Sequence, residues 1–214
     1  MLRYAPREMA SAVKPRNELR IIAGRWRGRR IRFPVGTTIR PTPDRVRETL
    51  FNWLAPHIRD ANVADLFAGS GALGLEALSR GAARALFVER DARCVEALTA
   101  HCAAFGATGN EIVRGDALTI LRTPHTTNRA PFDIVFIDPP FDADLWRATI
   151  DALESGNWLA PQAFVYLETP AAQSLPTLPV AWRTWREGKA GEVGYHLLRR
   201  SSPTAVAEPD TAEA

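Results

Sequence analysis

Residues 65–76 read Asp65-Leu66-Phe67-Ala68-Gly69-Ser70-Gly71-Ala72-Leu73-Gly74-Leu75-Glu76. The apolar run Val63–Phe67 predicts a short buried strand, and residues 72–80 have the composition of a helix. Between them, Gly69 and Gly71 predict a tight turn, because glycine has no Cβ and lets the backbone approach a ligand closely. The stretch therefore predicts a strand, a glycine-rich loop and a helix whose free N–H groups point at a ligand.

The glycine spacing leaves the identity of that ligand open. Gly69-x-Gly71-x-x-Gly74 matches the fingerprint of dinucleotide-binding proteins, so NAD is one candidate. Asp65 argues against NAD, because a carboxylate beside the loop would face a pyrophosphate badly. It would suit a ligand that carries an ammonium and a sulfonium. An NAD-dependent oxidoreductase is thus the weakest functional hypothesis, and a merely structural turn stays open from this stretch alone.

The chain around the loop alternates strand-like and helix-like segments, which predicts a mainly parallel sheet covered by helices. The further predicted strands are Arg84–Val88, Glu111–Val113, Phe132–Ile137 and Ala163–Glu168. Helices are expected after Asp91, from Leu118 and over Leu145–Ser155. The final segments, Trp182–Lys189 and Val193–Arg200, predict an antiparallel hairpin joined through Gly191.

Another helix is predicted ahead of the sheet, where Pro43 suits the first helical position. We expect Thr42 to cap it and Asp44 to complement its dipole. Its buried stripe is predicted to contain Val46, Leu50, Trp53 and Leu54, with Arg45, Arg47 and Glu48 off that stripe. This helix is expected to lie across the ligand pocket.

Acidic residues stand at or beside the carboxyl ends of four predicted strands, where open α/β sheets bind ligands. They are Asp65, Glu89, Asp116 and Asp138. Glu89 follows Gly69 by about twenty residues, the spacing at which a carboxylate can accept both ribose hydroxyls of an adenosine. Asp116 could accept from an adenine amino group, with the Ala117 N–H donating to a ring nitrogen. Helix capping by Asp116 and a surface pair between Glu89 and Arg90 or Arg93 are the structural alternatives.

The tetrapeptide Asp138-Pro139-Pro140-Phe141 ends the predicted central strand. An amino group conjugated to a purine ring is a poor nucleophile, because its lone pair is delocalised. The Asp138 carboxylate and the Pro139 carbonyl could hold both N–H bonds and turn that lone pair toward an electrophilic methyl group. Pro140 would stiffen the loop, and Phe141 could stack on the base. The pattern predicts methyl transfer to an exocyclic amino group, although Pro-Pro could also simply end a strand.

The charge of the 214-residue chain is unevenly distributed. Residues 1–47 hold 13 Lys and Arg against 3 Asp and Glu, whereas residues 48–214 hold 14 against 21. Such a basic segment on an acidic body predicts a polyanionic partner. We expect RNA or DNA contact from a set of mainly basic residues, namely Arg25, Trp26, Arg27, Arg29, Arg30, Arg32, Arg40 and Arg45. The alternative is a small β-appendage with inward apolar residues and solvated arginines.

Cysteine usage and hydropathy bound the cellular setting. Cys94 and Cys102 lie in a helical pattern without a CxxC pair, which is typical of buried thiols in a reduced, cytoplasmic protein. No apolar run approaches the length of a membrane span, no signal-peptide core is present, and no metal-ligand spacing is seen. We therefore expect a cytoplasmic protein without a metal site or a membrane partner.

These motifs together carry a resemblance to known enzymes. Asp65–Glu76, Glu89, Asp116 and Asp138–Phe141 resemble, in order and spacing, the class I methyltransferases that use S-adenosylmethionine (SAM). More narrowly, Arg20–Arg29 and Arg40–Leu54 resemble the RsmD family of bacterial 16S rRNA (guanine-N2)-methyltransferases. The match runs from about Leu19 to Arg200.

The resemblance implies a fold, a reaction and a set of site residues. The fold is a Rossmann-like, mainly parallel seven-stranded sheet with a C-terminal antiparallel hairpin and a small N-terminal β appendage. The reaction is methylation of the N2 amino group of one guanine, position 966 of 16S rRNA in the small ribosomal subunit, leaving S-adenosylhomocysteine. The expected catalytic residues are Asp138, Pro139, Pro140 and Phe141. The expected SAM-binding residues are Asp65, Phe67, Ala68, Gly69, Gly71, Glu89, Arg90, Asp116 and Ala117.

The expected organisation is a mobile tail (1–18), a basic hairpin appendage (19–39), the methyltransferase domain (40–200) and a disordered tail (201–214), acting as a monomer. The residues alone do not select guanine, since adenine-N6 methylation of DNA or RNA satisfies the same logic at Asp138. A non-catalytic RNA-binding assembly factor is the alternative from another class. It would be expected to show a broken glycine loop or degraded acids, and neither is seen.

Overall fold

The computed structural model describes residues 17–36, 42–123 and 130–201, so the predicted tails, Arg40 and most of the loop Thr123–Pro131 lie outside the described residues. Within the described part of the chain, seven strands form one sheet in the order β5-β4-β3-β6-β7-β9-β8. Their bounds are β3 Asn62–Asp65, β4 Arg84–Glu89, β5 Asn110–Arg114, β6 Phe132–Ile137, β7 Leu159–Pro170, β8 Trp182–Ala190 and β9 Val193–Arg200. Strands β3 to β7 are parallel to one another.

The C-terminal hairpin closes one side of this sheet. Strand β9 pairs antiparallel with both β7 and β8, with Tyr166 opposite Leu197 in the first of these pairs. The predicted α/β class, the central position of β6 and the antiparallel hairpin are confirmed. Strand β7 begins at Leu159, four residues before the predicted start, because Leu159 pairs with Phe132 across a register shift.

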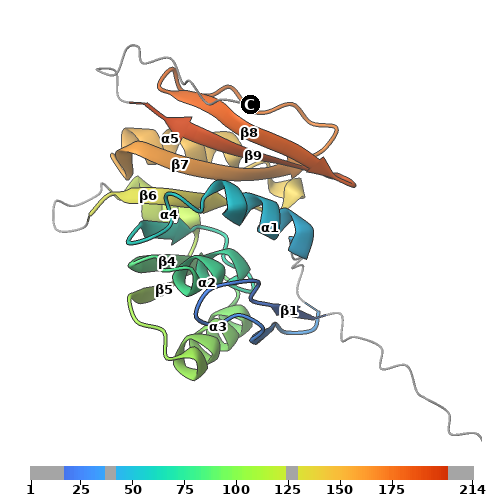
Figure 1. The fold of residues 1–214 in the computed structure, drawn as a ribbon. Coiled ribbons are helices and arrows are strands. Elements are labelled where there is room, and N and C mark those ends of the chain that lie inside the picture. The colour runs from blue at the N-terminus through green and yellow to red at the C-terminus, as the bar shows by residue number, and fades with distance from the viewer. Residues whose placement is uncertain (1–16, 37–41, 124–129, 202–214) are drawn as a thin grey trace, which may run out of the picture.

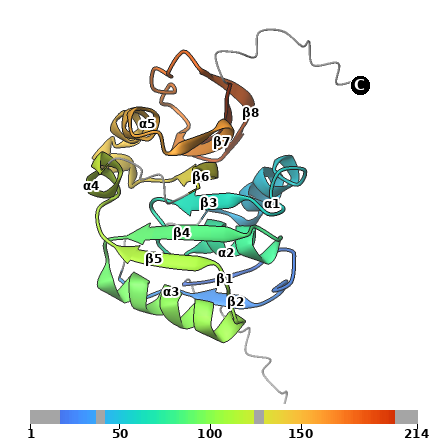
Figure 2. The same cartoon turned by 90° about the vertical axis from the view of Figure 1, so that its left-hand side faces the viewer.

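Helices cover both faces of the sheet (Figures 1 and 2). One face carries α1 (Asp44–Trp53), α2 (Ala72–Ser79) and α3 (Ala92–Phe105), and the other carries α4 (Ala117–Arg122) and α5 (Trp146–Ser155). Because side chains alternate along a strand, Phe136 faces the first layer and Ile137 the second. The central strands are therefore apolar on both sides, as expected for parallel strands buried between helices.

The N-terminal segment, residues 17–36, packs against α2 and α3 rather than standing apart (Figure 2). Strands β1 (Glu18–Arg20) and β2 (Arg30–Arg32) form a short antiparallel pair. Both strands are short, since β1 ends at Arg20 and β2 begins only at Arg30. The apolar residues of the segment join the core of this layer, namely Leu19, Ile21, Trp26, Ile31 and Phe33. The domain boundaries proposed from the sequence remain predictions.

Helix α1 departs from the sequence prediction at two residues. It begins at Asp44, and Thr42 does not cap it, because the Thr42 hydroxyl donates to Glu168 Oε1 at 2.6 Å. Arg47 was expected off the buried stripe but is fully buried, because it has ionic and hydrogen-bonding partners inside. The apolar stripe itself is confirmed, with Val46, Leu50 and Leu54 buried and Trp53 partly buried.

Other features of the described residues agree with the sequence. Cys94 and Cys102 are free and buried in α3, and burial raises the pKa of each thiol to about 11. A thiol with such a pKa is not poised to act as a nucleophile. None of the helices placed by the structure has the length and apolar character needed to cross a bilayer.

Candidate active site

The carboxyl ends of the parallel strands gather acidic residues at one edge of the sheet. Asp65 ends β3, Glu89 ends β4, Asp138 follows β6 and Glu168 lies near the end of β7. These four strands are consecutive neighbours in the sheet order. Asp116 lies just beyond β5, and the N–H of the intervening Gly115 donates to the Glu89 carbonyl at 3.0 Å. The structure therefore brings the predicted acids to one rim and adds Glu168 to them.

The glycine loop forms the tight connection from β3 to α2. Gly69 and Gly71 have φ values of +50° and +75°, in the region that only glycine adopts readily. At Gly74, an added Cβ would approach the Phe87 ring to 2.2 Å, so this glycine permits close packing of α2 on β4. The first two glycines thus shape the loop, and the third sets the distance between helix and strand.

Carboxylates already occupy two of the N–H groups in this region. Glu89 Oε2 accepts from Gly69 N at 2.7 Å, and Asp65 Oδ2 accepts from Gly74 N at 3.0 Å. Asp65 is buried, and this burial, followed by the charge on Glu89, raises its pKa to about 7 even though the Gly74 bond acts in the other direction. Negative groups at these positions oppose a pyrophosphate, which needs the N–H groups for itself.

The same two carboxylates fit SAM. Each carboxylate oxygen accepts more than one hydrogen bond, so Glu89 retains capacity for ribose hydroxyls while it holds Gly69 and Asp91 N–H. Asp65 offers a negative charge to an ammonium group. Of the remaining expected SAM-binding residues, Ala68 and Ala117 are buried, Phe67 is half-buried, and Arg90 is exposed. Their cofactor contacts stay predictions.

Asp116 combines the two roles considered for it only in part. Its carboxylate caps α4 by accepting from Thr119 N at 2.9 Å and from Thr119 Oγ1 at 3.0 Å. The side chain remains exposed at the rim beside Glu89. The surface pairs considered for Glu89 do not match its observed contacts, since it accepts from two backbone N–H groups and Arg93 pairs with Asp91 instead.

The segment Asp138–Phe141 leaves β6 beside this rim. Phe141 begins a short 3₁₀ turn (Phe141–Ala143) and its ring lies 6.1 Å from that of Trp146. Asp138 is partly accessible, and Pro139 is buried. Burial, then the nearby charge of Glu168 and that of Asp65, raises the pKa of Asp138 well above its ordinary value.

Glu168 is an acid of the rim that the sequence analysis did not include among the candidate site residues. It is 3% exposed, and its Oε1 accepts from Thr42 Oγ1 at 2.6 Å and from Tyr166 OH at 2.9 Å. The signal was present, because Glu168 ends a predicted strand in the same way as Asp65 and Glu89. That Glu168 lies next to Asp138 became evident only from the structure, which places β7 beside β6.

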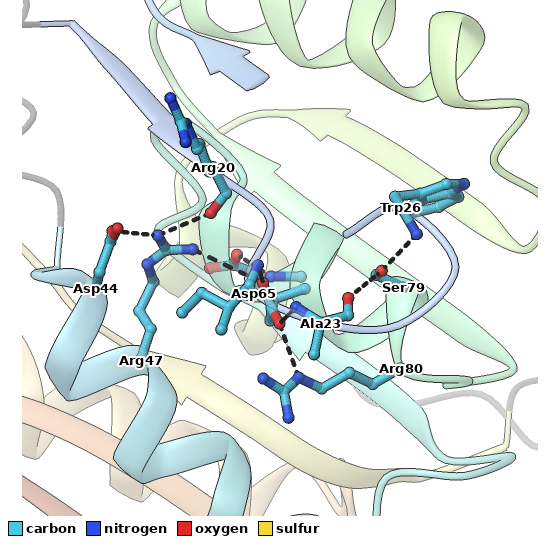
Figure 3. Close-up of polar contacts among 11 residues, drawn as sticks. Arg20, Ala23, Trp26, Asp44, Arg47, Asp65, Ser79 and Arg80 are labelled. Carbon is cyan, nitrogen blue, oxygen red and sulfur yellow. Dashed lines mark hydrogen bonds and ion pairs between the residues drawn. The ribbon is translucent and has the colours of Figure 1, made fainter. Parts of the chain in front are cut away.

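The support of the glycine loop extends to the N-terminal segment through Glu76 of α2, whose partners Ala23, Arg47 and Arg80 are labelled in Figure 3. The fully buried Glu76 carboxylate accepts from Ile22 N at 2.7 Å, Ala23 N at 2.9 Å and Arg80 Nε at 2.7 Å. Arg47 of α1 lies 3.8 Å from it, bonds to Asp44 at 2.6 Å and donates to the Arg20 carbonyl at 3.0 Å. Glu76 therefore joins α1, α2 and the N-terminal segment.

Trp26 is not placed to stack on a nucleic-acid base. Trp26 is 5% exposed, and its ring lies 5.4 Å from that of Phe105. Its backbone N–H donates to Ser79 Oγ at 3.0 Å. The Arg25 guanidinium covers the ring at 4.3 Å. Its large apolar surface is used in the core, so Trp26 is withdrawn from the expected RNA-binding set.

The described arginines that were expected to bind RNA are exposed but differ in their contacts. Arg30 and Arg32 both pair with Glu18, at 2.8 and 2.9 Å. Arg29 donates to the Ala104 carbonyl at 2.8 Å and lies over Phe105. Arg27 and Arg45 are exposed as well. Their role toward RNA stays a prediction, and no metal-binding cluster is found among the residues that the structure describes.

Known proteins match both the sequence and the structure. The family model described as conserved hypothetical protein 95 matches residues 19–199. Ribosomal RNA small subunit methyltransferase D of Escherichia coli strain K12 is 47% identical over 185 residues, covering 86% of this chain and 91% of the relative. The Haemophilus influenzae protein of the same name is 42% identical over 189 residues, covering 86% and 95%.

A solved structure described as a putative methyltransferase from Escherichia coli superposes with a TM-score of 0.80 at 47% identity. It covers 87% of this chain and 99% of that chain. Both the family model and the relatives span the glycine loop, the rim acids and Asp138–Phe141. The chain therefore belongs to the RsmD family of methyltransferases, whose sequence model carries the description conserved hypothetical protein 95.

Proposed function

We propose that this protein transfers a methyl group from SAM to the exocyclic N2 of a guanine in 16S rRNA of the small ribosomal subunit, at position 966. The observation that carries the proposal is the location of Asp138–Phe141 beside the acidic rim, one strand away from the glycine loop. The relatives named ribosomal RNA small subunit methyltransferase D support the substrate class. The individual position rests on the family resemblance.

The chain's own residues orient the target amino group. Its two N–H bonds would go to the Asp138 carboxylate and the Pro139 carbonyl, which turns the nitrogen lone pair out of conjugation with the ring. Pro139 and Pro140 restrict this segment, and Pro139 is buried, so the acceptors are held in position before the substrate arrives. Phe141, half-buried against Trp146, would contact the base.

SAM supplies a methyl group activated by a positively charged sulfur. Asp65 and Glu89 would hold its ammonium group and ribose hydroxyls, as their positions at the loop suggest. The amino nitrogen loses one proton when it gains the methyl group. Asp138 is the acceptor within reach of that nitrogen, and its raised pKa makes it a better base near neutral pH than an ordinary carboxylate.

RNA binding is assigned to the exposed arginines of the N-terminal segment and to Arg45. Such side chains pair with phosphates without reading sequence, so folded RNA in the subunit would itself supply selectivity. The target base would have to leave its stack to reach Asp138. Action in the cytoplasm as a monomer belongs to the same proposal.

Methyl transfer from labelled SAM tests the proposal, with small subunits lacking their native guanine methylations, free 16S rRNA and duplex DNA as acceptors. We expect N2-methylguanosine with the subunits. Replacing Asp138 with Ala should reduce the rate by about 100-fold or more, the scale of a lost acid–base group, with SAM still bound. Asp151→Asn, on the exposed side of α5, serves as the matched control.

Other products would redirect the assignment. N6-methyladenosine, or label in DNA, would keep the role of Asp138 and overturn the guanine assignment. SAM binding without transfer to any acceptor would favour a non-catalytic RNA-binding factor. Full activity of Asp138→Ala would refute the proposed role of that residue.

A further inference from the structure

Asp138 and Glu168 lie side by side at the ends of adjacent parallel strands. Ile137 of β6 pairs with Leu167 of β7, so the next residue on each strand is an acid. Phe136 and Tyr166 are also paired and face the α1 layer. Glu168 shares the face of Tyr166, because side chains two residues apart on a strand point to the same side. Asp138, the first residue after β6, follows the last paired position and lies near enough to Glu168 to interact with its charge.

Glu168 is held by two hydrogen bonds to its side chain and one to its backbone. The hydroxyls of Thr42 and Tyr166 donate to its Oε1, and Trp146 Nε1 donates to its backbone carbonyl at 2.7 Å. Hydroxyl donors stabilise the charged form of a carboxylate. Glu168 is thus a buried acid whose negative charge is supported by the segment before α1 and by β7 itself.

We propose that Glu168 is a positioning residue for methyl transfer: its carboxyl group, held beside Asp138, makes Asp138 a stronger base and lets the two carboxyl groups share the proton that the target amino group gives up. This inference rests on the proposed function. Two carboxylates that interact through the protein interior resist being ionised together, so the first proton to arrive is held firmly by the pair.

The proton balance of the transfer defines the role of the pair. The nitrogen lone pair forms the bond to the methyl carbon, and the sulfur keeps the electron pair of the bond that breaks. The nitrogen then sheds one proton to Asp138, and the Asp138–Glu168 pair carries one proton and one negative charge. Release of that proton to water restores the starting state.

The charged surroundings of Asp138 agree with this role. Of the described residues, Glu168 and Asp65 are the charged groups that raise the pKa of Asp138, after burial itself. Burial also raises the pKa of Glu168, while the bonds from Thr42 and Tyr166 lower it. The pKa of Tyr166 is raised well above its usual range by burial, by Glu168 and Asp138, and by Tyr195 of β9, so Tyr166 remains a donor.

Carboxyl ¹³C NMR titration of the free protein tests the inference. Glu168→Gln removes the neighbouring charge, so the titration midpoint of Asp138 should fall by about one pH unit or more. Glu154→Gln is the control, because Glu154 is a partly buried glutamate held by Arg200 and Trp182. It should leave the Asp138 midpoint unchanged.

Tyr166→Phe provides a second variant that keeps the shape of the site. With one donor lost, Glu168 holds the shared proton more of the time, and the Asp138 midpoint should fall by a smaller amount. An Asp138 midpoint that neither Glu168→Gln nor Tyr166→Phe moves would overturn the inference.

The pH dependence of kcat gives an independent readout. In Glu168→Gln the acid limb should move to lower pH, and kcat on the plateau should fall because Asp138 is a weaker base. A purely structural role would lower kcat at every pH without moving the limb, and that result would also overturn the inference. Loss of transfer in the wild-type protein would count against the proposed function alone, since the NMR titration needs no substrate.

Discussion

Asp65 is held in a state that depends on pH. Its carboxylate has one backbone hydrogen bond, from Gly74, and lies in the interior near the charge of Glu89. The pKa of Asp65 is raised from 3.8 to about 7, so the folded protein keeps its proton under conditions where the unfolded chain has lost it. The stability that Asp65 contributes is therefore fully present below about pH 4 and is lost as the pH rises through about 7.

Replacing Asp65 with Asn should remove this pH dependence while preserving an acceptor for Gly74. We expect the free energy of unfolding of Asp65→Asn, relative to the wild type, to increase between pH 5 and pH 8. Each unit of pKa shift corresponds to about 1.4 kcal/mol, so the relative gain should be on the order of a few kcal/mol. Urea unfolding at several pH values measures it. Parallel stability curves for the two proteins would contradict this account.

Single residues also show where sequence reasoning succeeds and where it ends. Asp65, Glu89 and Asp138 could be predicted to meet, because strand ends in a parallel sheet share one edge. Arg47 was misplaced because helical periodicity reports the spacing of apolar residues but not a buried carboxylate on another helix. Trp26 was misassigned for a related reason: an aromatic residue among arginines looks the same in sequence whether its ring is covered or free.

Helix α2 connects the ligand loop to the N-terminal segment. Its first residues follow Gly71, and its buried Glu76 receives two N–H groups of residues 22 and 23. Ser79, near its end, accepts from Trp26 N and donates to the Ala23 carbonyl at 2.6 Å. One short helix thus positions both the expected SAM loop and the basic segment.

Glu76→Ala should destabilise the protein by about 3–5 kcal/mol, because it leaves the N–H donors of Ile22, Ala23 and Arg80 without their acceptor and the buried Arg47 without a nearby negative charge. Arg47→Met should cost less. Two side-chain nitrogens of Arg47, Nε and Nη1, have no hydrogen-bond partner, and Glu76 would keep Arg80 and both backbone donors. Urea unfolding measures both variants, and Glu96→Ala on the exposed side of α3 is the control.

The variants Glu76→Ala and Arg47→Met can also be compared by proteolysis of the N-terminal segment. Trypsin should cut after its arginines faster in Glu76→Ala than in Arg47→Met or the wild type, because the segment loses its attachment to α2. Equal cleavage rates in all three proteins would show that Glu76 does not hold the segment in place.

Most helices and strands could be predicted from the sequence, because the pattern of apolar and polar residues within each segment indicates its secondary structure. The ends of α3 and the C-terminal hairpin agree with their capping and turn residues. The start of α1 does not agree with the predicted cap, since the Thr42 hydroxyl donates to Glu168, 126 positions along the chain. Contacts of that range depend on the assembled fold and leave no local pattern.

For the whole molecule, the separation of charge determines how it should meet RNA. The basic excess lies in residues 1–47, and the described arginines of that region, apart from the buried Arg47, are exposed on the N-terminal segment and α1. Replacing both Arg25 and Arg27 with Ala should weaken subunit binding and reduce the slope of log affinity against log salt by about 1–2. Arg84→Ala is the control, because Arg84 begins β4 at the end opposite the rim residue Glu89, and this variant should leave the slope unchanged.

Binding measured between about 50 and 200 mM salt would test this. An unchanged slope in the double variant would mean that these arginines do not contact phosphates.

The topology of the sheet could be predicted from the alternation of strands and helices, but the packing of the N-terminal segment over α2 and α3 could not. Its β-like pattern predicted a hairpin without saying what the hairpin packs against.

The attachment of the N-terminal segment also fixes an order of events during synthesis. Its hydrogen bonds reach Glu76, Ser79 and His101, between 53 and 69 residues farther along the chain. A growing chain therefore exposes this arginine-rich segment well before the helices that receive it have been made. For that interval the nascent protein carries an undocked cationic arm next to the RNA of the ribosome that is making it. Completion of α3 is the step that withdraws Trp26 and its neighbours into the core.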